Sequence, residues 1–341
     1  MTDIGEDQDN DQDQSITSDQ AAQSEGSTLS EGPGLNPAQQ QVLNELGSTD
    51  RPTFPMDLRA ELRQDLEQAL APALETTTDP LFISKRALGM IHGCEARYLA
   101  DKNEEFTWSI PAARGSVAHK AIELLVAHRG NPTPLDLVEG AMARIEADER
   151  SLSAFIQELN EAERAELSGR ANDFVTTFTE TFPPLSRKWV PVAESSVRAM
   201  LCQDSLTLMG RVDLSLGRAR GHEAGKVLID LKTGAPSHAH MEDLRFYALL
   251  ETLKIGVPPR LLVNYYLDAG EPRNETVTVD LLWSAAQRVV DGVVKLVELE
   301  GPEPRSPNKT PGYNCRFCPL NDTCEEGIRH LGNQEEDGWK P

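Results

Sequence analysis

The sequence predicts a mixed α/β protein, in which helices flank a central mixed sheet, a helical lobe precedes the sheet and a cysteine-rich segment follows it. Three observations predict this class. Apolar residues recur at helical spacing through most of residues 56–181. Near Pro191 the pattern changes to alternation with turn residues, which indicates antiparallel strands. Beyond residue 226, strand-like and helical stretches alternate, as in sheets that carry helices on their faces.

The first 45 residues are predicted to carry no helix or strand. Residues 1–50 contain eleven acidic residues and no Lys or Arg, so they carry −11 of the formal net charge of −22 and leave −11 for residues 51–341. Such a segment, also poor in large apolar residues, cannot bury enough surface to offset its chain entropy. We therefore predict a disordered acidic tail over residues 1–45 and a folded domain over residues 46–335. The tail either binds a basic partner or only solvates the protein.

The acidic balance argues against nucleic acid as a partner, because neutralising phosphates requires Lys and Arg. The objection is weaker for an enzyme whose divalent metal ions supply local positive charge. No run of 18 apolar residues occurs, so we expect no transmembrane helix and no membrane partner. The N-terminus lacks the basic and apolar regions of a signal peptide, which indicates a cytoplasmic protein. Its five cysteines are then expected to be metal ligands or free thiols rather than disulfides.

Five helices are predicted before residue 182. In the first, leucines recur every four residues from Leu58 to Leu70. The second ends in the sequence GCEARYLA, and the third begins at Ser116 and stops at Gly130. The predicted ranges are 56–74, 82–100, 116–130, 134–147 and 152–181.

The sheet is predicted from the remaining alternating stretches. Residues 192–217 read as two or three antiparallel strands, and VLIDLKTG (227–234) reads as a buried strand that ends at Thr-Gly. A strand pair joined by AGEPR follows a helix that ends at Gly256. The predicted ranges are a helix at 241–256, strands at 260–268 and 274–280, a helix at 281–299 and a Pro- and Cys-rich loop beyond.

Two carboxylates stand among apolar residues of neighbouring predicted strands. Asp230 follows three apolar residues in VLIDLKTG, and Asp213 lies between Val212 and Leu214 in GRVDLSLG. Buried carboxylates are costly unless they are paired or bind a cation, and two on adjacent strands can hold Mg²⁺ or Mn²⁺. Lys232 shares a strand face with Asp230 and could orient or deprotonate a metal-bound water. A surface ion pair of little energetic value is the alternative.

Three sequences resemble, in this order, the motifs of the PD-(D/E)XK nuclease superfamily and specifically its RecB-like exonuclease branch. They are GSVAHKAIELL, GRVDLSLG and VLIDLKTG, and the resemblance runs from about residue 84 to residue 324. It implies a restriction-endonuclease-like fold and metal-assisted attack of water on a phosphodiester.

The resemblance also implies roles for individual residues. It makes His119, Asp213 and Asp230 ligands of Mg²⁺ or Mn²⁺, adds the backbone carbonyl of Leu231 as a further ligand, and makes Lys232 the residue that orients the water. Without the resemblance, His119 in an otherwise apolar helix is more typical of a satisfied core or surface histidine.

The helix after VLIDLKTG departs from the family's Q-x-x-x-Y motif. It reads DLRFYALL, in which Tyr247 matches but Asp243 stands in the position of the Gln. A carboxylate there would repel a phosphate unless a cation intervenes, and Arg245 is the expected compensating cation. We predict that Tyr247 and Arg245 contact the substrate, with packing of Tyr247 in the helix core as the alternative.

The cysteines suit a metal centre. GYNCRFCPLNDTCEEG holds three of them, and GCEARYLA holds one far upstream. Four thiolates fit either Zn²⁺ or an iron–sulfur cluster, and zinc ribbons more often use two C-x₂-C pairs where this chain has one. The resemblance to AddB-type and CRISPR-associated relatives implies a structural 4Fe-4S cluster in segment 311–327, with zinc as the alternative. Cys202 is predicted to be a small buried residue. The implied cluster ligands are Cys94, Cys315, Cys318 and Cys324.

Taken together, the resemblance implies a DNA exonuclease of DNA repair or recombination that acts on single strands or free ends. No Walker A sequence occurs, so any motor would be a separate helicase. Two alternatives stay open: a catalytically inactive nuclease fold that binds nucleic acid or protein, and a nuclease directed at RNA.

Overall fold

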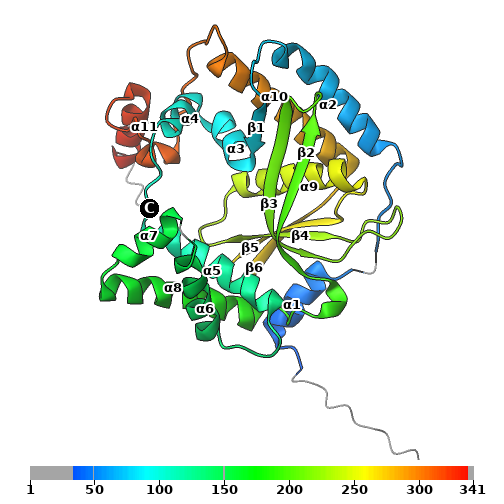
Figure 1. Ribbon diagram of the computed structural model, residues 1–341, viewed down its shortest axis with the longest axis vertical. Coiled ribbons are helices and arrows are strands. Elements are labelled where there is room, and N and C mark those ends of the chain that lie inside the picture. Colours follow the sequence, from blue (N-terminus) through cyan, green and yellow to red (C-terminus); the bar gives the residue numbers. More distant parts are fainter. Residues whose placement is uncertain (1–33, 49, 149, 337–341) are drawn as a thin grey trace, which may run out of the picture. The chain divides into compact units, whose positions relative to one another are not determined.

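A six-stranded mixed sheet lies at the centre of the computed structural model, which describes residues 34–48, 50–148 and 150–336 (Figure 1). Pairing is parallel for β1 with β3 and for β4 with β5, and antiparallel elsewhere. β2 covers one edge of β3, while β1 and β4 share the other edge at opposite ends. The predicted fold class is confirmed. The strands are β1 (Leu81–Ser84), β2 (Val192–Leu201), β3 (Leu206–Leu216), β4 (Val227–Lys232), β5 (Leu261–Tyr266) and β6 (Glu271–Thr276).

Helices cover both faces of the sheet (Figure 1). In the described part of the chain, none is long and apolar enough to cross a membrane. The helices are α1 (Pro37–Leu46), α2 (Leu58–Leu74), α3 (Lys85–Gly93), α4 (Glu95–Lys102), α5 (Ile110–Ala127), α6 (Pro134–Glu146), α7 (Ser151–Glu158), α8 (Glu161–Thr181), α9 (His238–Ile255), α10 (Val279–Glu300) and α11 (Glu325–Glu336), with 3₁₀ turns η1 (Arg187–Trp189) and η2 (Tyr313–Phe317).

Alternate residues of β4 face two separate cores. Leu228 belongs to the core shared with α2, α9 and α10, whereas Ile229 and Leu231 belong to the core shared with α5, α6 and α8. Asp230 has the parity of Leu228 and so projects to the side of α9. The alternation therefore places a carboxylate inside the protein, between apolar layers.

The N-terminal boundary of the fold differs from the prediction. Residues 37–45 were expected to be disordered, but they form α1, whose Val42 and Leu46 are buried. Asn36 caps this helix by a capping box with Gln39, and both side chains also donate to carbonyls at the end of α8. The expectation of disorder was wrong for this stretch because these tertiary contacts supply what the local composition lacks. Residues 1–33 of the predicted tail lie outside the described residues.

Several element boundaries also differ. The helix predicted over 82–100 begins instead as strand β1 and breaks at Cys94, between α3 and α4. The long helix predicted over 152–181 is interrupted where Asn160 caps α8. The last hairpin turns earlier than predicted, because Gly270 adopts a left-handed φ of 69° and lets β6 begin at Glu271. The C-terminal segment, predicted as a loop, contains η2 and α11.

A glycine–tyrosine contact joins the sheet to α9. A methyl group at Gly210 on β3 would collide with the ring of Tyr247, which is 2% exposed. Gly210→Ala is therefore expected to lower the free energy of unfolding by about 1–3 kcal/mol, the usual cost of overpacking. Urea unfolding followed by circular dichroism measures it.

Gly169→Ala is the matched control for this substitution. Gly169 lies within α8, and a methyl group at this position would meet no described atom within 4 Å beyond the chain of its own helix. Alanine should stabilise that helix by up to about 1 kcal/mol. An equal, small effect of both substitutions would contradict the proposed close packing of Gly210 on Tyr247.

Candidate active site

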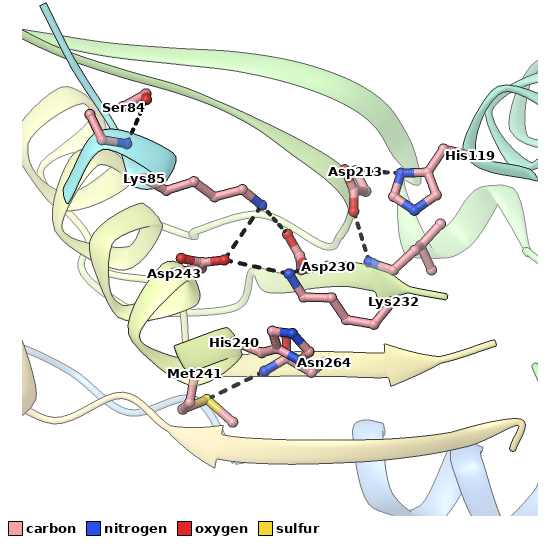
Figure 2. A network of polar contacts seen from close by, with 12 residues as sticks. Ser84, Lys85, His119, Asp213, Asp230, Lys232, His240, Met241, Asp243 and Asn264 are labelled. Atoms are coloured by element: carbon pink, nitrogen blue, oxygen red, sulfur yellow. Dashed lines mark hydrogen bonds and ion pairs between the residues drawn. The ribbon is translucent and has the colours of Figure 1, made fainter. Parts of the chain in front are cut away.

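Asp230 is buried near the end of β4 and contacts two ammonium groups (Figure 2). Its Oδ1 lies 2.7 Å from Nζ of Lys85, and its Oδ2 lies 2.6 Å from Nζ of Lys232. Burial alone would raise the pKa of Asp230, but the positive charges of Lys85 and Lys232 hold that pKa below its usual range. The carboxylate is therefore ionised at neutral pH. Its side chain is 1% exposed, which excludes a surface ion pair.

Lys85 was not predicted from the sequence. It is the first residue of α3, held by Ser84, whose hydroxyl caps the helix by accepting from the N–H of Ala87. Its ammonium also lies 5.0 Å from the ring centre of Tyr247. Burial lowers the pKa of Lys85, but the charge of Asp230, the hydrogen bond to it and the nearby Tyr247 and Asp213 together raise that pKa. Because residues 82–84 were predicted to be helical, no local pattern indicated that strand β1 delivers Lys85 to the sheet.

Asp213 and His119 meet beside Asp230 (Figure 2). Asp213 Oδ2 accepts a hydrogen bond of 2.8 Å from the N–H of Leu231, and Oδ1 lies 3.7 Å from Nδ1 of His119. Asp213 stands opposite Asp230, one position beyond the last ladder pair of β3 and β4. Burial raises the pKa of Asp213, and the charge of Asp230 adds to the rise, although His119 opposes it.

A row of polar residues crosses four neighbouring strands at this point. The register places Glu194 of β2 opposite Asp213, and it pairs Asp230 with Asn264 of β5. Asn264 is 1% exposed and its Oδ1 has no hydrogen-bond partner among the described residues. Neither Glu194 nor Asn264 was predicted from the sequence, because only the strand register aligns them with the predicted carboxylates.

Asp243, which replaces the expected Gln, faces the two lysines. Its Oδ2 lies 3.5 Å from Nζ of Lys232 and 4.0 Å from Nζ of Lys85. Burial raises the pKa of Asp243, although both ammonium groups oppose the rise. Lys232 and Lys85 therefore offset the negative charge of Asp243.

Arg245 does not compensate Asp243, contrary to our expectation. Its guanidinium is held by Glu275 of β6, at 2.8 Å and 2.5 Å, and by Glu242, at 2.6 Å. It therefore binds carboxylates away from Asp243, and the prediction that it would offset that charge is corrected. Tyr247 is buried in the core beneath Lys85, as in the alternative considered for it, and burial raises the pKa of its hydroxyl.

The residues of the site fit a divalent cation. Ligand atoms of His119, Glu194 and Asp213 all lie within 4.8 Å of one another. Oδ2 of Asp230 is buried and is held by Nζ of Lys232, while the buried Oδ1 of the neighbouring Asn264 has no hydrogen-bond partner among the described residues. Carboxylate oxygens with one imidazole suit Mg²⁺ or Mn²⁺. The structure fixes Leu231 beside them through its N–H, while the role of its carbonyl stays a prediction.

The four cysteines predicted to bind a cluster line one cavity of about 410 Å³, which extends to Lys85 and Asp243. Backbone N–H groups of Thr310 and Gly312 donate to two of the sulfurs, at 3.5 Å and 3.4 Å. Gly327 lies against the cavity: the methyl group of an alanine at this position would be 3.5 Å from the sulfur of Cys315 and 3.6 Å from that of Cys324. Cys202 lies elsewhere, partly buried against α2. The cavity-lining cysteines are Cys94, Cys315, Cys318 and Cys324.

A buried ion pair fastens the C-terminal segment next to Cys94. Glu95 is 3% exposed, accepts two hydrogen bonds from Arg305, at 2.6 Å and 3.0 Å, and accepts one from the N–H of Asn308. Hydrogen bonds from Arg305 lower the pKa of Glu95 from 4.5 to about 2. This contact joins the segment of Cys94 to the C-terminal segment independently of the cysteines.

Glu95→Gln is expected to lower the free energy of unfolding by about 1–3 kcal/mol at pH 7, because it removes a charged acceptor. Since the folded-state pKa is depressed, this stabilisation is present above pH 4.5 and is lost as the pH falls towards 2. Urea unfolding at pH 7 and pH 3 tests it, and the difference from the parent should shrink at pH 3. Glu298→Gln, which removes the half-exposed partner of Arg305, is the control and should matter little.

Comparisons with known proteins bear on these residues. A sequence model of the family described as the PD-(D/E)XK nuclease superfamily matches residues 83–325. Among solved structures, SSO0001 matches at 13% identity over 77% of this chain and 94% of its own, with a TM-score of 0.32. A candidate exonuclease of Eubacterium rectale matches at 10% identity over 78% and 91%, with a TM-score of 0.42. No curated protein matches. Both TM-scores are low, so the family assignment rests on the sequence match.

Proposed function

The chain belongs to the PD-(D/E)XK nuclease superfamily, whose members use divalent metals, and from this premise we propose that it is a metal-dependent DNA exonuclease of the RecB-like branch. The observation that carries the proposal is the meeting of Asp213, Asp230 and Lys232 beside His119. Two carboxylates, an imidazole and an ammonium group are the donor set that phosphodiester hydrolysis by a metal-activated water requires.

Each residue has a definite task in this proposal. His119, Asp213, Asp230 and the carbonyl of Leu231 hold the cation, which when bound supplies a water of lowered pKa and neutralises phosphate charge. Lys232, at 2.6 Å from Asp230, orients the attacking water. The second ammonium, from Lys85, keeps Asp230 ionised when Lys232 turns to the substrate.

Charged side chains line the cavity beside the cysteines, and neighbouring carboxylates neutralise its cations. Among the described residues, four cationic side chains line it beside a single carboxylate, Asp243, although the whole chain carries a formal charge of −22. Each of these cations has a carboxylate partner: Lys85 pairs with Asp230, Arg86 and Arg97 pair with Asp101, and Lys309 pairs with Glu326. The lining cations are Lys85, Arg86, Arg97 and Lys309.

We propose a 4Fe-4S cluster as the occupant of the cysteine cavity. A single zinc ion at 2.3 Å from each sulfur would bring the thiolates to about 3.8 Å from one another. Among the described residues, His119, Glu194 and Asp213 are the group whose ligand atoms lie within 4.8 Å, and no three cysteines do. The wider spacing and the N–H···S contacts suit a cluster. Its role is structural, joining α4 to the C-terminal segment.

The test is cleavage of an end-labelled single strand of DNA by anaerobically purified protein with Mg²⁺ or Mn²⁺. Removal of nucleotides from an end is expected, with no cleavage of a closed circle of the same sequence. Cleavage of the circle would make it an endonuclease, and cleavage of RNA alone would move the substrate to RNA. If neither polymer is cleaved, either a separate helicase must deliver the strand or the protein binds nucleic acid without cleaving it. Cleavage of duplex DNA in the presence of an added helicase would indicate the first, and no cleavage the second.

A further inference from the structure

Glu194 has an unusual backbone conformation for a strand residue. It lies within β2 with a left-handed φ of 52°, while Ala193 and Ser195 on either side keep their ladder partners on β3. A residue other than glycine in this region is uncommon, and such strain collects at functional sites. The surrounding ladder thus holds Glu194 in one orientation, at the point where β2 reaches the active site.

The strand register directs Glu194 at the carboxylates of the site. It stands opposite Asp213, which in turn stands opposite Asp230, so three acidic residues occupy one row across three strands. Like charges directly opposite one another destabilise a sheet. A row of this kind is suited to a divalent cation, whose charge offsets the repulsion between the carboxylates.

The positive charges of the site are unevenly placed along the row. Lys85 and Lys232 hold the two oxygens of Asp230. At the other end, Glu194 and Asp213 lie with His119, all three having ligand atoms within 4.8 Å of one another. At that end the carboxylates meet the exposed Arg211 and the imidazole of His119 rather than two buried ammonium groups, so a bound cation would add charge compensation there.

An ion pair with Arg211 is the alternative explanation for Glu194. Nε of Arg211 lies 2.8 Å from the carboxylate, and the arginine side chain is 63% exposed. Ion pairs with so exposed a partner contribute little to stability. The pair with Arg211 also does not explain why Glu194 lies close to His119 and Asp213. The pair is therefore compatible with a second role of the carboxylate.

We infer that Glu194 is a further protein ligand of the divalent cation, completing with His119 and Asp213 one side of its coordination. The inference rests on the proposed function, because it concerns the ion that the nuclease site is proposed to bind. It assigns Mg²⁺ or Mn²⁺ a carboxylate from edge strand β2 in addition to the ligands on α5, β3 and β4. The left-handed conformation of Glu194 orients this ligand.

The experiment measures Mn²⁺ binding to the full chain by the loss of the electron paramagnetic resonance signal of free Mn²⁺, without any substrate. Glu194→Gln is expected to weaken binding by about tenfold or more, because loss of even an outer-shell partner of a ligand lowers metal affinity by about 10–100-fold. Glu194→Gly should do the same while keeping or raising the melting temperature, because glycine adopts the left-handed conformation without strain. This second variant removes the carboxylate without relying on a strained backbone.

Arg211→Ala separates a ligand from an ion-pair residue. It removes the pair but keeps the carboxylate of Glu194, so Mn²⁺ affinity should change by less than about fivefold. If Arg211→Ala weakens binding as much as Glu194→Gln, Glu194 acts through its ion pair and the inference fails.

Asp213→Asn separates the inference from the proposed function. If Asp213→Asn loses Mn²⁺ binding while both Glu194 variants bind as the parent does, the inference is overturned and the proposed metal site stands. If Asp213→Asn also binds as the parent does, the proposed metal site fails, and the inference fails with it.

Discussion

Replacing Lys232 with alanine is expected to lower metal-dependent DNA cleavage by about a hundredfold or more, the usual effect of removing a group that aids proton transfer or stabilises developing charge. The protein should stay folded, because Lys85 remains 2.7 Å from Asp230 and keeps that buried carboxylate paired. The second ammonium makes Lys232 a cleaner probe of chemistry than Asp230, whose removal would leave two lysines without their shared partner. Initial rates at saturating Mn²⁺ measure the effect.

Lys254→Ala is the matched control for Lys232→Ala. Lys254 lies in the last turn of α9 and donates to the backbone carbonyl of Ser196, outside the site. Its removal should leave the cleavage rate within about twofold of the parent, as for most surface substitutions. A Lys232→Ala variant that cleaves as fast as Lys254→Ala would contradict the role assigned to Lys232.

The second large effect is expected from Cys318→Ser. The variant should lose bound iron and the brown absorbance of the cluster, together with roughly 2–5 kcal/mol of stability, by analogy with the loss of a covalent cross-link. The loss of stability should be smaller than if the cluster alone joined the segment of Cys94 to that of Cys315. Glu95 and Arg305 already join the same two segments. Iron analysis and chemical unfolding of anaerobically purified protein measure both.

Cys202→Ser provides the comparison for the cluster. Cys202 is partly buried against α2, apart from the cavity that holds the other four cysteines. Its substitution should keep iron and colour. A parent protein that carries stoichiometric zinc and no iron would contradict the cluster, and a Cys318→Ser variant with full iron content would remove Cys318 from it.

The core of the candidate site could be predicted from local sequence. Asp213, Asp230 and Lys232 lie in short motifs where strand alternation fixes which residues share a face, and His119 lies in a motif of a single helix. The structure brings these four together. Their proposed catalytic roles await the experiments above.

Lys85 and Glu194 could not be predicted in the same way, because strand pairing rather than local pattern places them. Lys85 reaches Asp230 only because β1 pairs in parallel with β3, and the four residues of β1 run into α3 without a visible break. Glu194 depends on the register between β2 and β3. Pairings between segments far apart in sequence leave no local periodicity.

Asp243 and Arg245 lie two residues apart but have different partners. Both lie on α9, and their proximity in sequence suggested that one charge offsets the other. The helix turns them apart, so that Asp243 meets the lysines of the site while Arg245 meets Glu275 of β6. Residues two apart on a helix do not face each other.

A divalent ion held by Glu194, Asp213 and Asp230 together with His119 is proposed to drive phosphodiester cleavage. The most direct measurement titrates Mn²⁺ into the full chain and records bound Mn²⁺ and the cleavage rate of an end-labelled single strand of DNA on the same sample. We predict no cleavage in EDTA and a rate that rises and saturates with bound Mn²⁺. Cleavage that persists in EDTA, or a cleavage rate that does not follow bound Mn²⁺, would contradict the claim.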